Sequence, residues 1–162
     1  MIHAIKVVNI VQITDSFPSA SDTDFNFVRE LIIEGHIPDD VTVQVLTQSR
    51  EPLIIKTIES LKGCKNAIIH LYNSTSTLQR EVVFKETMEG VKKIATDGAK
   101  IIADHLHQLV SSNIRLQYSP ESFTGTELPY ALEVCENVLD VWQASVDKPV
   151  IINLPATVEM ST

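Results

Sequence analysis

Five short segments rich in β-branched residues recur along the chain and predict β-strands. They occupy residues 5–13, 41–46, 66–72, 114–118 and 149–154. Several are nearly continuous apolar runs, such as Ala67-Ile68-Ile69, rather than alternations of apolar and polar residues. Continuous apolar strands are typical of parallel sheets that are covered on both faces. The pattern therefore favours a buried parallel sheet.

Four segments with helical spacing of apolar residues separate these strands. Most have a polar capping residue or a proline at the start and a glycine near the end. The third segment is long, and we expect Gly90 and the Asp97-Gly98 pair to break or bend it. The expected helices are 22–34, 51–61, 77–110 and 126–142. Asp22 or Thr23 is expected to cap the first, with Phe25, Val28 and Ile32 on one stripe, and Ser49 is expected to cap the second. The fourth begins with capping-box spacing from Thr124 to Glu127, and one of its faces carries Leu128, Leu132, Cys135 and Leu139.

The alternation of strands and helices predicts an α/β fold with right-handed crossovers. No linker or low-complexity tract divides the 162 residues, so we expect a single domain over residues 1–162. A closed (β/α)₈ barrel takes about 250 residues, or about 31 per unit, and at that rate this chain supplies about five units. No strand is followed by a glycine-rich phosphate loop, which argues against dinucleotide binding.

Charge and composition exclude several classes of function. The 13 basic and 21 acidic residues give a net charge of −8, with no basic cluster that would suit a nucleic acid. Apolar runs are far shorter than the roughly 20 residues that span a bilayer, and the N-terminus does not read as a signal peptide. Cys64 and Cys135 lack metal-ligand spacing and are interpreted as reduced thiols. We expect a cytoplasmic protein, with a mitochondrial location as the alternative.

Polar residues gather directly after the expected strands, where parallel α/β folds carry their functional groups. His70, Ser119, Glu121 and Thr157 are the most informative of them. Each has an ordinary structural explanation, because serine and threonine cap helices and a histidine can end a strand without any function. Their shared position after parallel strands instead places them on one rim.

Six ordered blocks of sequence resemble 2-isopropylmalate synthase, over about nine-tenths of the chain. The most specific are Ser-Pro-Glu-Ser-Phe-Thr-Gly-Thr-Glu at 119–127 and Asn-Leu-Pro-Ala-Thr-Val-Glu-Met at 153–160. The blocks are residues 16–21 with 23–25, 37–41, 45–48, 70–76, 118–127 and 153–160.

The resemblance implies a TIM-barrel catalytic domain that condenses acetyl-CoA with 2-oxoisovalerate in leucine biosynthesis. It also implies a divalent metal ion (Mg, Mn or Zn) in the complete enzyme, which polarises the keto group. His70, Ser119, Glu121 and Thr157 match family positions that line the 2-oxo-acid pocket. Their hydroxyl, imidazole and carboxyl groups suit hydrogen bonding to the carboxylate and keto oxygens.

Other family features are not found in this sequence. The Asp-Gly-x-Arg motif of the first barrel strand is missing, and Thr14 stands where a glutamate is usual, with Asp15 one residue away. His105 and His107 imitate the family's metal pair but fall in a helical pattern, where positions i and i+2 do not share a face. We therefore expect barrel strands two to six with a divergent segment over 1–16, no metal bound by this chain, no assignable catalytic residue, and no activity alone.

Two other functions stay open at this point. One is a homocitrate or citramalate synthase-like enzyme that acts on another 2-oxo acid, and the other is a non-catalytic binding or interaction module derived from the barrel. An incomplete barrel also has strand edges without partners, so we expect homo-oligomerisation or other self-association.

Overall fold

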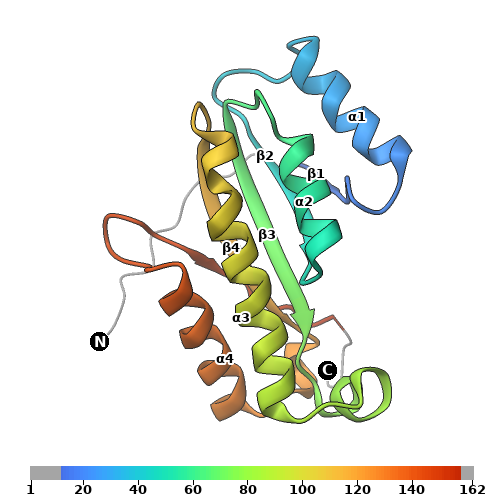
Figure 1. Ribbon diagram of the computed structural model, residues 1–162, viewed down its shortest axis with the longest axis vertical. Helices are drawn as coiled ribbons and strands as arrows, with labels where there is room; N and C mark the ends of the chain where they lie inside the picture. The colour runs from blue at the N-terminus through green and yellow to red at the C-terminus, as the bar shows by residue number, and fades with distance from the viewer. Residues whose placement is uncertain (1–11, 158–162) are drawn as a thin grey trace.

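The sheet contains five parallel strands that neighbour one another in chain order. The computed structural model describes residues 12–157 (Figure 1). The expectation of a parallel α/β sheet is confirmed, whereas the first expected strand, 5–13, lies almost entirely outside the described residues. The strands are β1 (Gln12–Ser16), β2 (Thr42–Gln48), β3 (Asn66–Ser74), β4 (Asn113–Glu121) and β5 (Ile151–Ile152).

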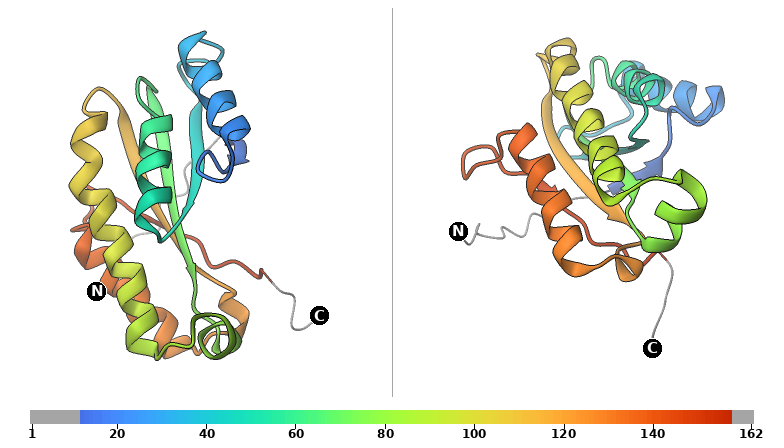
Figure 2. Two further views of the ribbon diagram at one scale, coloured as in Figure 1. Left: turned by 45° about the vertical axis from the view of Figure 1, so that its right-hand side comes forward. Right: turned by 60° about the horizontal axis from the view of Figure 1, so that its bottom comes forward.

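The main helices follow one another along one face of the curved sheet, each connecting two parallel strands (Figure 2). This is the arrangement of a part of an α/β barrel, with helices outside and the sheet curving around the other face. The helices are α1 (Asp22–Ile33), α2 (Glu51–Ser60), α3 (Met88–His105) and α4 (Leu128–Val141), with short turns η1 (Gln79–Phe84), η2 (Leu106–Leu109) and η3 (Phe123–Gly125).

The hydrophobic core lies between the sheet and these helices. Val45, Ile69 and Tyr118 project from β2, β3 and β4 into it and are fully buried. Trp142, just after α4, is also buried, and its Nε1 donates a hydrogen bond to the carbonyl of Ala99 in α3, at 2.9 Å. Burial of this apolar surface is the main force that holds the helices on the sheet.

The opposite face of the sheet is more polar than the apolar runs suggested. Gln44, His70 and Gln117 occupy its middle and are all buried, with Ile68 the fully buried apolar neighbour. Ala67, Ile68 and Ile69 are therefore buried on both sides of β3, as predicted, but the flanking strands alternate between an apolar and a polar face.

The long third helical segment is interrupted at a different place from the one predicted. Gly90 and Gly98 both lie inside the continuous helix α3, so the expected breaks there are wrong. The interruption comes earlier, where the π-helical turn η1 ends at Lys85 in the left-handed conformation with φ 53°. Thr87 then caps α3 by accepting a hydrogen bond from the amide of Gly90, at 3.1 Å. Gly98 is buried instead by close contact with Ser49.

Three of the expected helix caps are also wrong. Ser21, rather than Asp22 or Thr23, caps α1 by accepting a hydrogen bond from the amide of Asp24. Ser49 does not cap α2, because its hydroxyl donates to the carbonyl of Ile94 in α3. The Thr124–Glu127 capping box does not form either: the N-cap of α4 is Glu127, which makes no side-chain cap bond.

The buried face of α4 differs from the predicted leucine stripe. Leu128 and Leu132 are 68% and 60% exposed, although Cys135 is buried as expected. The apolar face is shifted by about a quarter of a turn from the predicted one. The buried residues of α4 are Tyr130, Ala131, Val134, Cys135 and Val138.

Within the described part of the chain, no helix combines the length and the apolar character that crossing a lipid bilayer requires.

We predict that Gly98→Ala destabilises the fold even though alanine favours helices. A Cβ at Gly98 would lie 2.0 Å from Oγ of Ser49, which is itself bonded to Ile94. Relieving that overlap costs about 1–3 kcal/mol of unfolding free energy. Gly90→Ala is the matched control: its Cβ meets only the flexible end of Glu86, so a gain of up to about 1 kcal/mol is expected. Urea denaturation measures both, and equal effects of the two substitutions would contradict the prediction.

Candidate functional site

A cavity of about 350 Å³ opens at the carboxyl end of the sheet. All four residues singled out in the sequence, His70, Ser119, Glu121 and Thr157, line it. They come from β3, β4 and the segment after β5, and parallel pairing of those strands brings them together. The remaining lining residues are Phe17, Gln44, Leu46, Tyr72, Gln117, Asn153 and Pro155.

The imidazole of His70 is held between two glutamine amides. Its Nδ1 lies 3.2 Å from the side-chain nitrogens of both Gln44 and Gln117, and its Nε2 lies 2.7 Å from Oγ of Ser119. The side-chain nitrogen of Gln117 also lies 3.3 Å from Nε2, so this amide reaches both ring nitrogens. The contact with Ser119 is the shortest of the four.

The hydroxyl of Ser119 receives a second hydrogen bond from the side-chain amide of Asn153, at 2.8 Å. His70 and Asn153 therefore contact the Ser119 oxygen from two sides. Ser119 is 2% exposed and lines the cavity. The site thus presents a hydroxyl of fixed position to the cavity.

Glu121 is the last residue of β4 and is partly buried at the cavity. Its main-chain carbonyl accepts a hydrogen bond from the amide of Thr75, at 3.1 Å, which fixes the end of the strand. Burial raises the pKa of the Glu121 carboxyl above its ordinary value. Burial also raises the pKa of the neighbouring Tyr72 hydroxyl, and the negative charge of Glu121 adds to that effect.

Thr157 is an exposed residue, and its hydroxyl accepts a hydrogen bond from the amide of Ser122, at 3.0 Å. Ser122 directs this amide by adopting the left-handed conformation, with φ 56°. The segment after β5 is therefore fixed to the end of β4 at the rim of the cavity.

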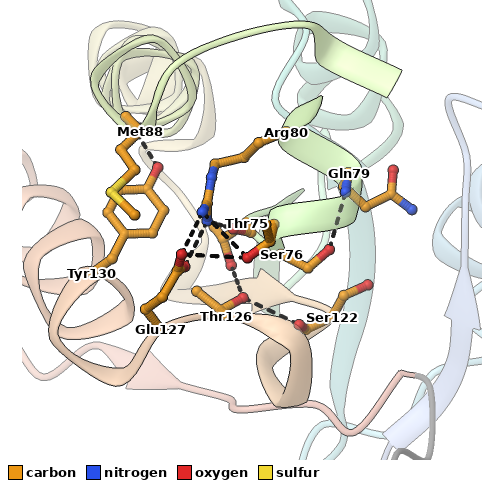
Figure 3. Close-up of polar contacts among 10 residues, drawn as sticks. Thr75, Ser76, Gln79, Arg80, Met88, Ser122, Thr126, Glu127 and Tyr130 are labelled. Carbon is orange, nitrogen blue, oxygen red and sulfur yellow. Dashed lines mark hydrogen bonds and ion pairs between the residues drawn. The ribbon is translucent and has the colours of Figure 1, made fainter. Parts of the chain in front are cut away.

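Figure 3 shows a second cluster of polar side chains, which lies between the loops that follow β3 and β4. The buried guanidinium of Arg80 forms two hydrogen bonds with Glu127, of 2.9 and 2.7 Å, and one with the carbonyl of Thr75, of 2.6 Å. Thr126 and Thr75 share a hydrogen bond of 2.8 Å between their hydroxyls. The Arg80 hydrogen bond is the largest cause that lowers the pKa of Glu127 to about 2. The cluster thus ties the loop after β3 to the loop after β4.

The described residues do not fit a divalent metal ion by themselves. Within residues 12–157, no group of three or more His, Cys, Asp and Glu side chains converges. His105 and His107 lie at the end of α3, where each ring donates from Nδ1 to a main-chain carbonyl, of Ile101 and Asp104 respectively. The side chains of Thr14 and Asp15 lie outside the described residues.

A larger hollow of about 540 Å³ adjoins the cavity and shares Tyr72 and Glu121 with it. It lies beyond the ends of β2 and β3, with Arg50 and Gln79 among its polar lining residues and Phe84 among its apolar ones.

Sequence reasoning missed several residues of the site. Gln44 and Gln117 were not singled out, although each is a polar residue between two apolar ones in an expected strand. That alternation was the available signal, because a polar side chain in a buried strand must face a hydrogen-bond partner. Arg80 and Glu127 carried no comparable signal, since Arg80 falls within the expected helix 77–110 and Glu127 was interpreted as a capping residue.

Comparison with known proteins agrees with this geometry. The model of the HMGL-like family, a TIM-barrel family, matches residues 1–162. The chain is 60% identical to a 2-isopropylmalate synthase of Renibacterium salmoninarum over 93% of its length, and 61% identical to one of Parafrankia sp. over 93%. A 2-isopropylmalate synthase of Pseudomonas putida is 53% identical over 96% of the chain. The chain spans 26%, 27% and 28% of these relatives, respectively.

The fold is a parallel sheet covered by helices, with a cavity at the carboxyl end of its strands. The family model matches the sequence over its full length. The chain belongs to the HMGL-like family.

Proposed function

We propose that this chain forms part of the catalytic barrel of a 2-isopropylmalate synthase and that its cavity binds the 2-oxo-acid substrate, 2-oxoisovalerate. The observation that carries the proposal is the convergence of His70, Ser119, Glu121 and Thr157 on one cavity. These are the positions at which the sequence resembles the oxo-acid pocket of that family. Relatives about 60% identical to the chain carry the same enzyme name.

The chemistry of the cavity suits a small branched 2-oxo acid. Its volume of about 350 Å³ is at the lower end of the range for small-molecule sites. Phe17 and Tyr72 pack edge to face, with ring centres 5.8 Å apart, and with Leu46 supply apolar surface for an isopropyl group. In contrast to this apolar surface, Ser119 supplies a hydroxyl that can donate to the carboxylate or the keto oxygen.

In this proposal the chain binds and orients the oxo acid. The imidazole of His70 and the amide of Asn153 fix the hydroxyl of Ser119, so this group needs little reorganisation when substrate arrives. Enzymes of the HMGL-like family typically depend on a divalent metal ion. The residues that the structure describes contain no group of three or more His, Cys, Asp or Glu side chains that could hold such an ion. The acyl donor of the reaction is acetyl-CoA.

Binding of 2-oxoisovalerate to the 162-residue chain tests the proposal. Isothermal titration calorimetry should give saturable binding that is stronger than that of pyruvate or 2-oxoglutarate. Ser119→Ala removes a hydrogen bond to a charged group, so the Kd should rise by about tenfold or more. Ser60→Ala changes an equally buried serine at the far end of α2 and should leave the Kd unchanged. Tighter binding of pyruvate or 2-oxoglutarate would support a citramalate or homocitrate synthase-like relative instead.

The affinity for the oxo acid should fall as the pH rises through the pKa of Glu121. Burial holds that pKa above the ordinary 4.5, so the neutral carboxyl persists to higher pH than usual. Once ionised, Glu121 repels the substrate carboxylate. Titrations at several pH values should show this decline in the native chain and a flatter profile in Glu121→Gln. A Glu121→Gln profile identical to the native one would assign the pH dependence to another group, such as His70.

We also propose that the chain self-associates. Among the described strands, β1 and β5 each pair with a single neighbour, so each presents one edge without a described strand partner. Exposed edges of this kind favour pairing with another copy. Light scattering during size-exclusion chromatography should give a mass of at least twice 18.0 kDa. A monodisperse monomer with a sharp cooperative melt would contradict this proposal.

A further inference from the structure

We propose that Arg80 and Glu127 are positioning residues for the oxo-acid cavity and fix the main chain that presents Glu121 and Thr157. Neither residue lines the cavity, so any influence on a ligand passes through other groups. The identity of the ligand rests on the proposed function. The contacts that link Arg80 to the cavity do not depend on that function.

The first step is the geometry of Arg80. Its guanidinium is 5% exposed and meets both carboxylate oxygens of Glu127 in a two-pronged pair. The same group lies 4.9 Å from the ring centre of Tyr130, whose hydroxyl donates to the carbonyl of Met88 at 2.7 Å. Arg80 is therefore held by Glu127, by the ring of Tyr130 and by the carbonyl of Thr75. Tyr130 is in turn bonded to Met88 at the start of α3 (Figure 3).

The second step leads from Arg80 to Glu121. Arg80 holds the carbonyl of Thr75 at 2.6 Å, and the amide of Thr75 donates to the carbonyl of Glu121 at 3.1 Å. Because the pairing of β3 with β4 extends only to Ser74 and Glu121, this bond adds one further link beyond the last strand pair. Arg80 therefore fixes the orientation of Thr75, and Thr75 fixes the residue that carries the cavity carboxyl.

The third step leads to Thr157. The hydroxyl of Thr126 is bonded to that of Thr75 at 2.8 Å and to the carbonyl of Ser122 at 3.1 Å. The amide of Ser122 in turn donates to the hydroxyl of Thr157. A residue other than glycine remains in the left-handed conformation of Ser122 only when its surroundings hold it there. The cluster around Arg80 provides those surroundings.

A second ion pair in the same region shows what a purely structural role looks like. Lys92 of α3 contacts Glu89 and Glu133, each at 2.6 Å, and so links α3 to α4. The hydrogen bonds that lead from Arg80 to the cavity run through Thr75, Thr126 and Ser122, and neither Lys92 nor its two partners takes part in them. Lys92→Gln is thus a control that removes an ion pair of α4 without disturbing the path from Arg80.

The experiment compares Arg80→Lys, Thr126→Val and Lys92→Gln in the 162-residue chain. Lysine retains the charge of Arg80 but cannot bridge Glu127 and the Thr75 carbonyl with one planar fork. Valine keeps the shape of Thr126 and removes only its hydroxyl. The readouts are amide hydrogen exchange at Thr75 and Ser122, the NMR-detected pKa of the Glu121 carboxyl, and the Kd for 2-oxoisovalerate.

In Arg80→Lys we expect the exchange of both amides to accelerate by about tenfold and the Kd to rise by about tenfold. The pKa of the Glu121 carboxyl should differ from its value in the native chain. In Thr126→Val the exchange of the Ser122 amide and the Kd should change in the same direction. Lys92→Gln should leave all three readouts at their native values. If Arg80→Lys does not fold, Thr126→Val decides the outcome.

Native exchange rates and a native Glu121 pKa in a folded Arg80→Lys variant would overturn the inference. So would equal changes in Lys92→Gln, because they would indicate general loosening of the fold. If the native chain binds no 2-oxo acid, the proposed function fails, and the exchange rates and the pKa still decide whether Arg80 positions Glu121.

Discussion

The pairing of β3 with β4 is the constraint on which the rest of the site depends. These strands run in register from Asn66 opposite Asn113 to Ser74 opposite Glu121, the longest pairing in the sheet. Because side chains alternate between faces, this register places His70 opposite Gln117 and, two residues on, Tyr72 opposite Ser119, all on the cavity side. A slip of β4 by one residue would turn Gln117 and Ser119 toward the helices and away from His70.

The polar groups in the middle of the sheet impose a second condition, because a buried donor or acceptor without a partner is costly. Gln44, His70 and Gln117 meet that condition together, since both amides lie within hydrogen-bonding distance of the imidazole and Ser119 contacts its Nε2. The orientation of each group thus depends on the others. A change at His70 would remove one contact from each of its three neighbours.

Much of this architecture could be predicted from sequence, and the remainder shows why some of it could not. Short apolar segments and their order were sufficient for the parallel sheet. The expected position of Ser119 and Glu121 after a strand was close enough to bring them to the cavity, although β4 extends through both residues. Local patterns failed where a distant contact decided the outcome. Gly98 reads as a helix breaker, but it is retained inside α3 because Ser49 comes too close for a side chain. Glu127 reads as half of a capping box, but its carboxylate is bound to Arg80.

The two walls of the cavity rest on strand pairings of very different length. One wall belongs to the extended β3–β4 pairing, whereas the other follows β5, which pairs with β4 through Ile151 and Ile152. Because fewer ladder bonds lower the free energy of local opening, we expect the segment after β5 to open before the β3–β4 wall. A ligand that contacts both Ser119 and Thr157 would order that segment as it binds. Ligand affinity and local folding of the fifth strand are therefore linked equilibria, and temperature would act on both at once.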